Sequence, residues 1–231
     1  MTATRAGAQT FAGKTIVVTG GARGIGALLA SELRWRGAKV ITADVSDGAD
    51  LRCDISNEDQ VDALFAAAGA IDGLVNNAAL LVARKASTDI TVAEFRTMLD
   101  VNVIGTFLCA RAAARSMAER GGSIVNVASE TAFTGSHGFA HYVASKGAVV
   151  SLTRALANEY GPANIRVNCL APGFTPTPGS DVLGTYDPSR TPLGRVMEPK
   201  DLLGTICYLL SDDAAFVSGQ TMLVNGGRVT H

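Results

Sequence analysis

Residues 14–37 constrain the fold of this chain more than any other stretch. An apolar run over 14–19 leads into a turn that holds Gly20, Gly24 and Gly26, and an amphipathic segment follows. This order predicts a buried strand, a tight turn and a helix. Because glycine lets the backbone approach a ligand and a helix N-terminus attracts anions, the turn predicts a pyrophosphate site. The absence of a following Gly-Lys-Ser/Thr excludes a Walker-type loop, and a turn without a ligand is the alternative.

The next apolar run, residues 39–44, ends in a carboxylate at Asp44. In a dinucleotide-binding unit, a carboxylate at this position accepts hydrogen bonds from the adenosine ribose hydroxyls and repels a 2′-phosphate. Asp44 therefore favours NAD over NADP. Arg23 in the glycine turn leaves NADP open, since a guanidinium there would offset part of the repulsion. The alternative is that Asp44 only ends the strand and starts a turn.

Strand and helix patterns alternate along the rest of the chain. The next strand is expected at residues 54–56. Only nine residues, 45–53, separate it from the strand at 39–44, and this is too few for a crossover helix of usual length. A long helix over 91–119 is interrupted at 100–105, where an Asn and a Gly predict a kink. Further strands are expected at 71–79, 123–128, 165–170 and 221–224, and further helices at 57–65, 142–160 and 199–210. About seven strands predict a single α/β domain over residues 1–231, a doubly wound parallel sheet with helices on both faces.

A candidate catalytic group follows the expected strand at 123–128. Ser129 stands at its carboxyl end, and Tyr142 and Lys146 lie one helical turn apart at the start of a helix, so all three are expected to face one crevice. An ammonium beside a phenol favours the phenolate, and we therefore expect the pKa of Tyr142 to fall below its usual ~10. Such a Tyr could act as general acid or base. The alternative is a lysine stem packed against an aromatic ring.

Composition excludes several classes of function. The formal net charge is -1 and the basic residues are scattered, so neither nucleic acid nor an anionic membrane is expected as a partner. The N-terminus does not resemble a signal peptide, and no apolar run approaches the ~20 residues of a membrane span, which predicts a cytoplasmic protein. The four cysteines show no Cys-x-x-Cys pair and are expected to be buried free thiols: Cys53, Cys109, Cys169 and Cys207. His137 and His141 lie four apart, but the loop predicted there makes a metal site improbable.

From Lys14 to about Gly227, the chain resembles the short-chain dehydrogenase/reductase family of the classical type. The resemblance rests on several motifs in the family order: Thr19-Gly20-x-x-x-Gly24-x-Gly26, Asp54, Asn76-Asn77-Ala78-Ala79, Asn102, Ser129, Tyr142, Lys146, and Pro172-Gly173 with Thr177. The intervals agree as well, with thirteen positions from Ser129 to Tyr142 and four from Tyr142 to Lys146. The resemblance implies a Rossmann fold and hydride transfer between NAD and a secondary alcohol or ketone.

The resemblance also implies roles for individual residues. Tyr142 would be the general acid or base, Lys146 would hold the nicotinamide ribose and favour the phenolate, and Ser129 would bind the substrate oxygen. Asn102 would hold a water that relays protons from Lys146. The implied cofactor site consists of Gly20, Arg23, Gly24, Ile25, Gly26, Asp44, Asp54, Ile55, Asn77, Ala78, Tyr142, Lys146, Pro172, Gly173, Thr175 and Thr177. Family members are usually tetramers, which predicts a homotetramer or homodimer built on helices around 106–119 and 149–159.

Two departures from the family pattern bear on the cofactor. Ala79 replaces the usual Gly of the Asn-Asn-Ala-Gly turn, which demands an ordinary backbone conformation there and predicts slight repacking. The missing third helix is expected to expose more of the adenine side.

The substrate is expected to be a neutral or aromatic alcohol or ketone. The irregular segment 174–192 is the predicted substrate loop or lid. The residues expected to face the substrate are mostly apolar: Ser129, Thr131, Phe133, His137, Phe139 and Phe174, with Leu80, Leu81, Val82, Val182, Leu183 and Tyr186 around them. One alternative is a 3-oxoacyl-(acyl-carrier-protein) reductase that uses NADPH. Another is a nucleotide-sensing regulator without turnover, although the intact Asn-Ser-Tyr-Lys set argues against it.

Overall fold

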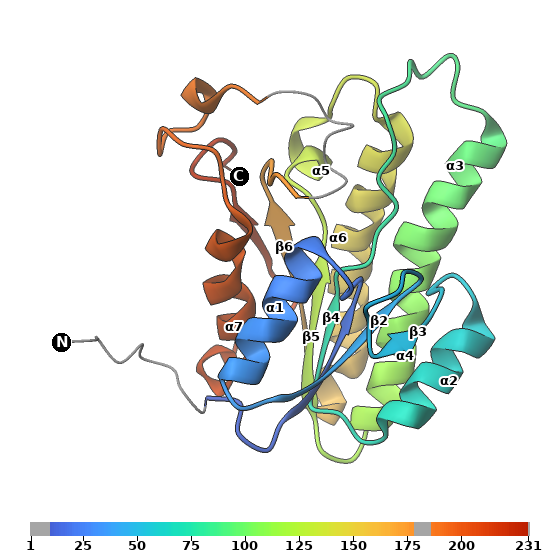
Figure 1. The fold of residues 1–231 in the computed structure, drawn as a ribbon, viewed down its shortest axis with the longest axis vertical. Helices are drawn as coiled ribbons and strands as arrows, with labels where there is room; N and C mark the ends of the chain where they lie inside the picture. The colour runs from blue at the N-terminus through green and yellow to red at the C-terminus, as the bar shows by residue number, and fades with distance from the viewer. Residues whose placement is uncertain (1–9, 178–185, 231) are drawn as a thin grey trace.

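A seven-stranded parallel sheet forms the centre of the molecule (Figure 1). The structure is a computed structural model that describes residues 10–177 and 186–230. The strands run in the order β3-β2-β1-β4-β5-β6-β7, so the chain winds outward from β1 in both directions. Their bounds are β1 Thr15–Thr19, β2 Lys39–Asp44, β3 Leu51–Arg52, β4 Gly73–Asn76, β5 Gly122–Val127, β6 Ile165–Pro172 and β7 Thr221–Val224. The predicted doubly wound α/β fold is confirmed.

Helices cover both faces of the sheet, and alternate strand residues pack under them. On β1, Val17 joins the core beneath α2, α4 and α6, whereas Ile16 and Val18 join the core beneath α1 and α7. This alternation follows from the two-residue period of a strand. The helices are α1 Gly24–Trp35, α2 Glu58–Ala68, α3 Val92–Leu99, α4 Thr106–Met117, α5 Thr131–Thr134, α6 Ala140–Tyr160 and α7 Leu203–Leu210. Short 3₁₀ turns lie at Gly161–Ala163, Pro188–Arg190, Pro199–Leu202 and Asp212–Ala214.

The register of the central strands brings polar residues together at their carboxyl ends. Thr19 of β1 is paired with Asn76 of β4, and Asn76 with Asn126 of β5. The buried Asn76 Nδ2 donates to Asn126 Oδ1 at 3.0 Å, and Asn126 Nδ2 donates to Thr153 Oγ1 on α6, also at 3.0 Å. These bonds fix the spacing of β4, β5 and α6 at the edge where the predicted site lies.

The third strand differs from the prediction in position. β3 is Leu51–Arg52 and pairs with the end of β2, with Leu51 opposite Ala43. It therefore precedes the segment 54–56, where Asp54 Oδ1 accepts bonds from the amide and hydroxyl of Ser56 and holds a turn instead. The prediction that no crossover helix fits between β2 and β3 is confirmed, since six residues separate the two strands.

The predicted interruption of the long helix is a π-helical segment, Asp100–Gly105, between α3 and α4. A Cβ on Gly105 would lie 2.7 Å from the Ile55 side chain, so the close approach there needs a glycine. The continuous helical segment Val92–Met117 is long enough to cross a membrane, with a mean hydropathy of 1.2 in its most apolar window. An apolar segment of this length was not detected from the sequence alone. Of the apolar window, 56% is buried inside the protein, as in a core helix.

The four cysteines are buried and free, as expected. Burial raises the pKa of Cys53, Cys169 and Cys207 to about 11. The thiols are therefore protonated at neutral pH, and they pack as small apolar groups.

Candidate active site

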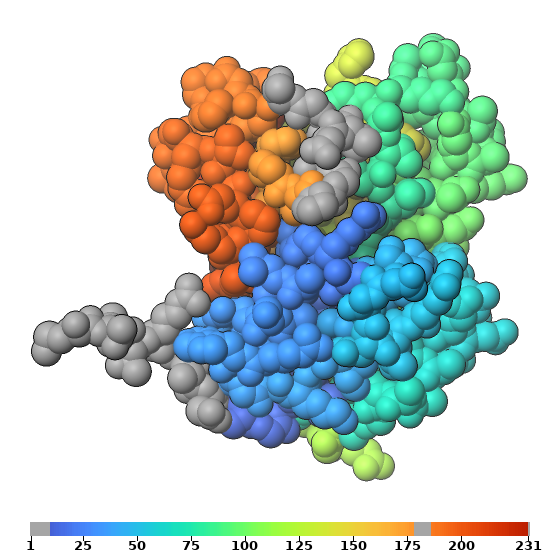
Figure 2. All heavy atoms as spheres, in the orientation of Figure 1, coloured from blue at the N-terminus to red at the C-terminus, as the bar shows by residue number. Residues whose placement is uncertain are grey.

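A cleft of about 750 Å³ opens at the carboxyl edge of the sheet. It is lined by the turns that follow β1, β2, β4, β5 and β6 and by the start of α6. Figure 2 shows two of these regions, the blue segment that enters α1 and the orange segment after β6, meeting on the visible face. Parallel α/β sheets bind ligands at this edge, because the strand order reverses direction there.

The glycine turn at the start of α1 forms a cradle of bare backbone. Gly20 has a φ of +67°, and a Cβ on Gly26 would lie 2.1 Å from the carbonyl oxygen of Gly20. Asn77 Nδ2 donates to the carbonyls of Thr19 and Gly20, both at 3.0 Å, and so holds the turn. The N-cap residue of α1, Arg23, makes no capping bond through its side chain. The turn and the uncapped helix end fit the pyrophosphate of a dinucleotide.

Carboxylates line the end of the cleft beside β2 and β3. Asp44 Oδ2 accepts from the amide of Ala22 at 3.1 Å, and Asp44 Oδ1 accepts from the amide of Ser46 at 2.9 Å. Asp44 thus both shapes the turn and faces the cleft. These two observations agree with both interpretations drawn from the sequence, a turn-forming residue and a ribose-binding carboxylate. Asp54 and the exposed Arg23 lie at the same end, so the structure leaves the choice between NAD and NADP open.

The structure brings Ser129, Tyr142 and Lys146 to the same wall of the cleft. Tyr142 is in the first turn of α6, which begins two residues earlier than predicted, at Ala140. The Ser129 hydroxyl acts on the pKa of the Tyr142 phenol and accepts hydrogen bonds from the amide and the hydroxyl of Thr131, at 3.2 and 3.0 Å. The buried Lys146 Nζ donates to the carbonyl oxygen of Val127 at 2.8 Å and lies 5.7 Å from the centroid of the Tyr142 ring.

The expected lowering of the Tyr142 pKa is wrong for the protein in this structure. Burial raises the pKa of Tyr142 to about 12, and the Ser129 hydroxyl opposes this only in part. Burial also lowers the pKa of Lys146 to about 8. The physical reason is that the packed wall disfavours both charged forms, while the ammonium bonds to a backbone carbonyl instead of the phenol.

Asn102 lies behind the wall and does not line the cleft. Its Oδ1 accepts from the amide of Leu80 at 2.7 Å, and its Nδ2 lies 3.2 Å from the Leu80 carbonyl and 3.0 Å from Ser145 Oγ. Ser145 Oγ donates in turn to the carbonyl of Tyr142 at 2.7 Å. The side chain therefore ties the segment after β4 to α6. Its predicted role in holding a water stays a prediction.

The predicted substrate residues divide into two groups. Thr131, Phe139 and Phe174 line the cleft, as do Leu80, Leu81 and Tyr186. Phe133, His137 and Val82 do not: Phe133 packs against the core cluster around Val149, and His137 is exposed beyond the rim. Phe133 lies in the short helix α5, which the sequence did not predict, and His137 follows in the loop after it. Val182 and Leu183, with the rest of 178–185, lie outside the described residues.

Ala79 adopts an ordinary backbone conformation, as expected. Within the described chain, the one non-glycine residue with positive φ is Asn164. Ala79 is exposed and lines the cleft, so its methyl group adds to the wall without straining the turn.

Sequence reasoning missed five charged residues at the cleft: Arg84, Glu130, Asp187, Arg190 and Arg228. Glu130 directly follows Ser129 and is 2% exposed, and its Oε1 accepts from Arg228 Nη1 at 2.5 Å. These two residues are 98 positions apart, so no local pattern could pair them. The sequence did offer one indication that Glu130 lies at the cleft, namely its position next to Ser129.

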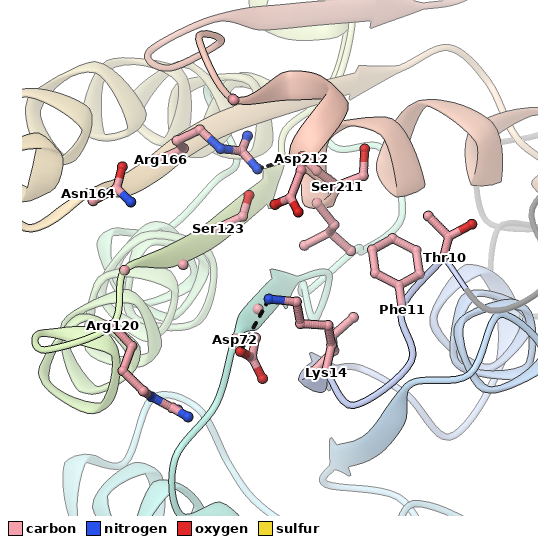
Figure 3. A pocket seen from close by; sticks show the side chains of 16 residues that line it. Thr10, Phe11, Lys14, Asp72, Arg120, Ser123, Asn164, Arg166, Ser211 and Asp212 are labelled. Carbon is pink, nitrogen blue, oxygen red and sulfur yellow. Dashed lines mark hydrogen bonds and ion pairs between the residues drawn. The ribbon is translucent and has the colours of Figure 1, made fainter.

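A smaller hollow of about 180 Å³ lies at the opposite, amino edge of the sheet (Figure 3). Its charged groups already have partners: Lys14 Nζ lies 3.6 Å from Asp72 Oδ1, and Arg166 donates to the carbonyls of Leu209 and Ser211. In Figure 3, Arg120 points away from the centre of this hollow. Among the described residues, no group of three or more His, Cys, Asp or Glu could hold a metal ion. The larger cleft is therefore the candidate active site.

Comparison with known proteins gives the family. The profile described as enoyl-(acyl carrier protein) reductase matches residues 20–228. The chain is 41% identical to a 2,5-dichloro-2,5-cyclohexadiene-1,4-diol dehydrogenase of Sphingobium indicum, over 94% of this chain and 97% of the relative. It is 38% identical to the cis-4-hydroxycyclohexanecarboxylate dehydrogenase of Sinomonas cyclohexanicum, over 95% of this chain and 98% of the relative.

Solved structures agree with this result. A short-chain type dehydrogenase/reductase from Mycobacterium marinum superimposes with a TM-score of 0.89 at 33% identity, covering 96% of this chain and 97% of that one. A 3-ketoacyl-(acyl-carrier-protein) reductase from Brucella melitensis, complexed with NADH, gives a TM-score of 0.86 at 34% identity, covering 94% and 99%. With these relatives along its whole length, the chain belongs to the short-chain dehydrogenase/reductase family of nicotinamide-dependent oxidoreductases that act on CH–OH groups.

Proposed function

We propose that this enzyme transfers hydride between NAD and a secondary alcohol or ketone carried on an aromatic or alicyclic ring. The observation that carries the proposal is that Ser129, Tyr142 and Lys146 share one cleft with the glycine turn and Asp44. A bound nicotinamide would accept or supply the hydride. Gly20, Gly26 and the N-terminus of α1 would hold its pyrophosphate.

The phenol of Tyr142 moves the proton. Because burial raises its pKa to about 12, Tyr142 is protonated at neutral pH and is ready to donate to a ketone oxygen during reduction. Alcohol oxidation requires the phenolate, and the ammonium of Lys146, 5.7 Å from the ring centroid, is the nearby cation that stabilises it. The Ser129 hydroxyl, on the same wall of the cleft as Tyr142, binds the same substrate oxygen.

Two observations support NAD and a ring-bearing substrate. The carboxylate of Asp44 faces the adenosine end of the cleft, where it would repel a 2′-phosphate. The substrate end is walled by Leu80, Leu81, Phe139 and Phe174, which suit an apolar ring. The names of two relatives, a cyclohexadienediol dehydrogenase and a hydroxycyclohexanecarboxylate dehydrogenase, are consistent with a ring-bearing carbinol.

The test is oxidation of secondary alcohols by the purified enzyme. With NAD and either cyclohexanol or 1-phenylethanol, we expect NADH absorbance to appear, and Tyr142→Phe to lower kcat at least ~100-fold by removing the acid–base group. Tyr160→Phe, at the far end of the same helix, is the matched control and should keep its activity. Turnover that survives in Tyr142→Phe would refute the assigned mechanism.

A second candidate is reduction of a 3-oxoacyl thioester with NADPH. The names of the matching family profile and of the Brucella structure support the acyl-carrier-protein substrate, but the Brucella reductase is complexed with NADH and does not support NADPH. Asp44 argues against NADPH, and a direct comparison of NADH with NADPH on acetoacetyl thioesters and on cyclohexanone decides between the candidates. A cytoplasmic homotetramer or homodimer stays a prediction, and light scattering tests its oligomeric part.

A further inference from the structure

Two aromatic walls face the substrate end of the cleft. On one side the rings of Phe174 and Tyr186 stack with centroids 5.0 Å apart and planes 4° apart. On the other side Phe139 lies against Tyr142, with centroids 5.6 Å apart and planes at 48°. All four side chains line the cleft. Because Tyr142 is the proposed acid–base group, the reacting carbon lies near this second wall.

Each wall carries an arginine. The guanidinium carbon of Arg228 lies 5.3 Å from the centroid of the Tyr186 ring, and that of Arg84 lies 4.4 Å from the centroid of the Phe139 ring. Stacking on an aromatic face leaves the edge of a guanidinium, where its N–H groups point, free for other partners. Both arginines line the cleft.

Arg228 is held in place by a buried network. Its Nη1 donates to Oε1 of Glu130, whose backbone amide donates to the carbonyl of Pro172 at 2.9 Å. The ring beneath it is fixed too, since Tyr186 Oη lies 2.6 Å from Oγ1 of the buried Thr191. The Arg228 side chain remains 27% exposed. A guanidinium has five N–H donors, and within the described residues the guanidinium of Arg228 makes one hydrogen bond, to Glu130.

Charge is distributed unevenly along the cleft. The end beside β2 carries two carboxylates, Asp44 and Asp54, against one arginine. The substrate end carries three arginines, Arg84, Arg190 and Arg228, against the carboxylates of Glu130 and Asp187. The positive charge at the substrate end would therefore attract an anionic group on a bound ring.

We propose that Arg228 binds a carboxylate on the substrate, so that the enzyme acts on ring-bearing hydroxy acids. The inference rests on the proposed function and adds the substrate class. The planar fork of an arginine matches the two oxygens of a carboxylate, and the stacked rings of Phe174 and Tyr186 place that fork beside an apolar ring site. On this proposal the substrate has an apolar reacting ring and a charged far end, in contrast to the neutral substrate expected from the sequence.

The test compares two probes of similar shape, cis-4-hydroxycyclohexanecarboxylate and cis-4-methylcyclohexanol, each with NAD. The wild-type enzyme should prefer the acid by at least ~10-fold in kcat/KM. Arg228→Gln should lower kcat/KM for the acid by about 10- to 100-fold, mainly through KM, and change the value for the neutral alcohol by less than about 3-fold. The loss of one charge-assisted hydrogen bond between enzyme and substrate corresponds to a decrease of this size in kcat/KM.

Two further variants separate recognition from folding and from general electrostatics. Arg228→Lys keeps a cation beside Glu130 but loses the fork, so it should fold normally and lose several-fold of the acid preference. Arg190→Gln removes an equal charge from the same rim and should change the acid preference by less than about 3-fold. An effect of Arg190→Gln equal to that of Arg228→Gln would overturn the proposal.

The outcomes also distinguish this inference from the proposed function. Oxidation of the neutral alcohol without preference for the acid refutes the carboxylate site alone. Equal losses on both probes in Arg228→Gln and Arg228→Lys assign Arg228 a purely structural role and refute the site as well. Absence of turnover with both probes and with cyclohexanol refutes the proposed function itself.

Discussion

Lys146 should make the protein less stable at neutral pH than an apolar residue of the same length. The residue is 3% exposed, and its ammonium bonds to the Val127 carbonyl, with no carboxylate partner among the described residues. Burial lowers the pKa of Lys146 from 10.5 to about 8. At pH 7 the folded protein therefore contains a charged group that its surroundings disfavour.

The magnitude follows from the two pKa values. A lowering from 10.5 to about 8 corresponds to about 3 kcal/mol of folding free energy, at about 1.4 kcal/mol per pKa unit. Lys146→Met removes this penalty and loses about 1 kcal/mol with the Val127 hydrogen bond, so we expect a net gain of about 2 kcal/mol at pH 7. Because the pKa is lower in the folded state, the unfolded state binds more protons between pH 8 and 10.5. Wild-type stability therefore rises relative to Lys146→Met through that window, and the advantage of the variant disappears.

Urea unfolding at pH 7 and at pH 10.5, at one protein concentration, measures this difference. Lys39→Met, at an exposed position in β2, is the control and should change stability by less than about 0.5 kcal/mol at both pH values. The reasoning is refuted if Lys146→Met is less stable than wild type at pH 7, or if its advantage is the same at both pH values.

Three other substitutions test the site. Gly26→Ala places a Cβ 2.1 Å from the Gly20 carbonyl and should cost about 3 kcal/mol or more in urea unfolding and abolish NAD binding, whereas Gly204→Ala, in α7 with nothing within 4 Å, should be neutral or stabilising. Asp44→Ala removes the charge that would repel a 2′-phosphate, so the ratio of NADPH to NADH affinity, measured by fluorescence titration, should rise at least ~10-fold; an unchanged ratio contradicts the assigned role. Asn102→Ala leaves the Leu80 amide unsatisfied and should lower the free energy of unfolding by about 2 kcal/mol, and a loss of activity without loss of stability would instead support the water-relay role.

Local patterns in the sequence were sufficient to predict the fold and to name residues that the structure brings together in one cleft. The glycine turn, Asp44 and the pair of Tyr142 and Lys146 are each defined by neighbours within a few residues, and the parallel topology then brings them to one edge. The third strand was misplaced because a two-residue strand has no period to detect. Its position depends on pairing with Ala43 and Asp44 in β2.

Features that depend on long-range packing could not be predicted from the sequence. The direction of the Tyr142 pKa shift depends on how tightly the wall buries the phenol and on where the Lys146 ammonium turns, neither of which follows from their spacing. The side-chain direction of Phe133 depends on its place in the short helix α5. Arg228 reaches the cleft only because the end of β7 lies beside β6, next to Pro172.

The two buried charges at the exit of β5 support the interpretation of this edge as a functional site. Lys146 and Glu130 are both almost fully buried, yet they do not pair with each other: one bonds to the Val127 carbonyl and the other to Arg228. Burial lowers the pKa of Lys146 and raises that of Glu130, so each charged form is disfavoured where it lies. Apolar residues of similar size would stabilise the fold more, since a buried ion gains back its desolvation cost only with excellent partners. Stability alone therefore does not explain these side chains, whereas the proposed roles do: Lys146 as the cation beside the acid–base phenol, and Glu130 as the anion that positions Arg228.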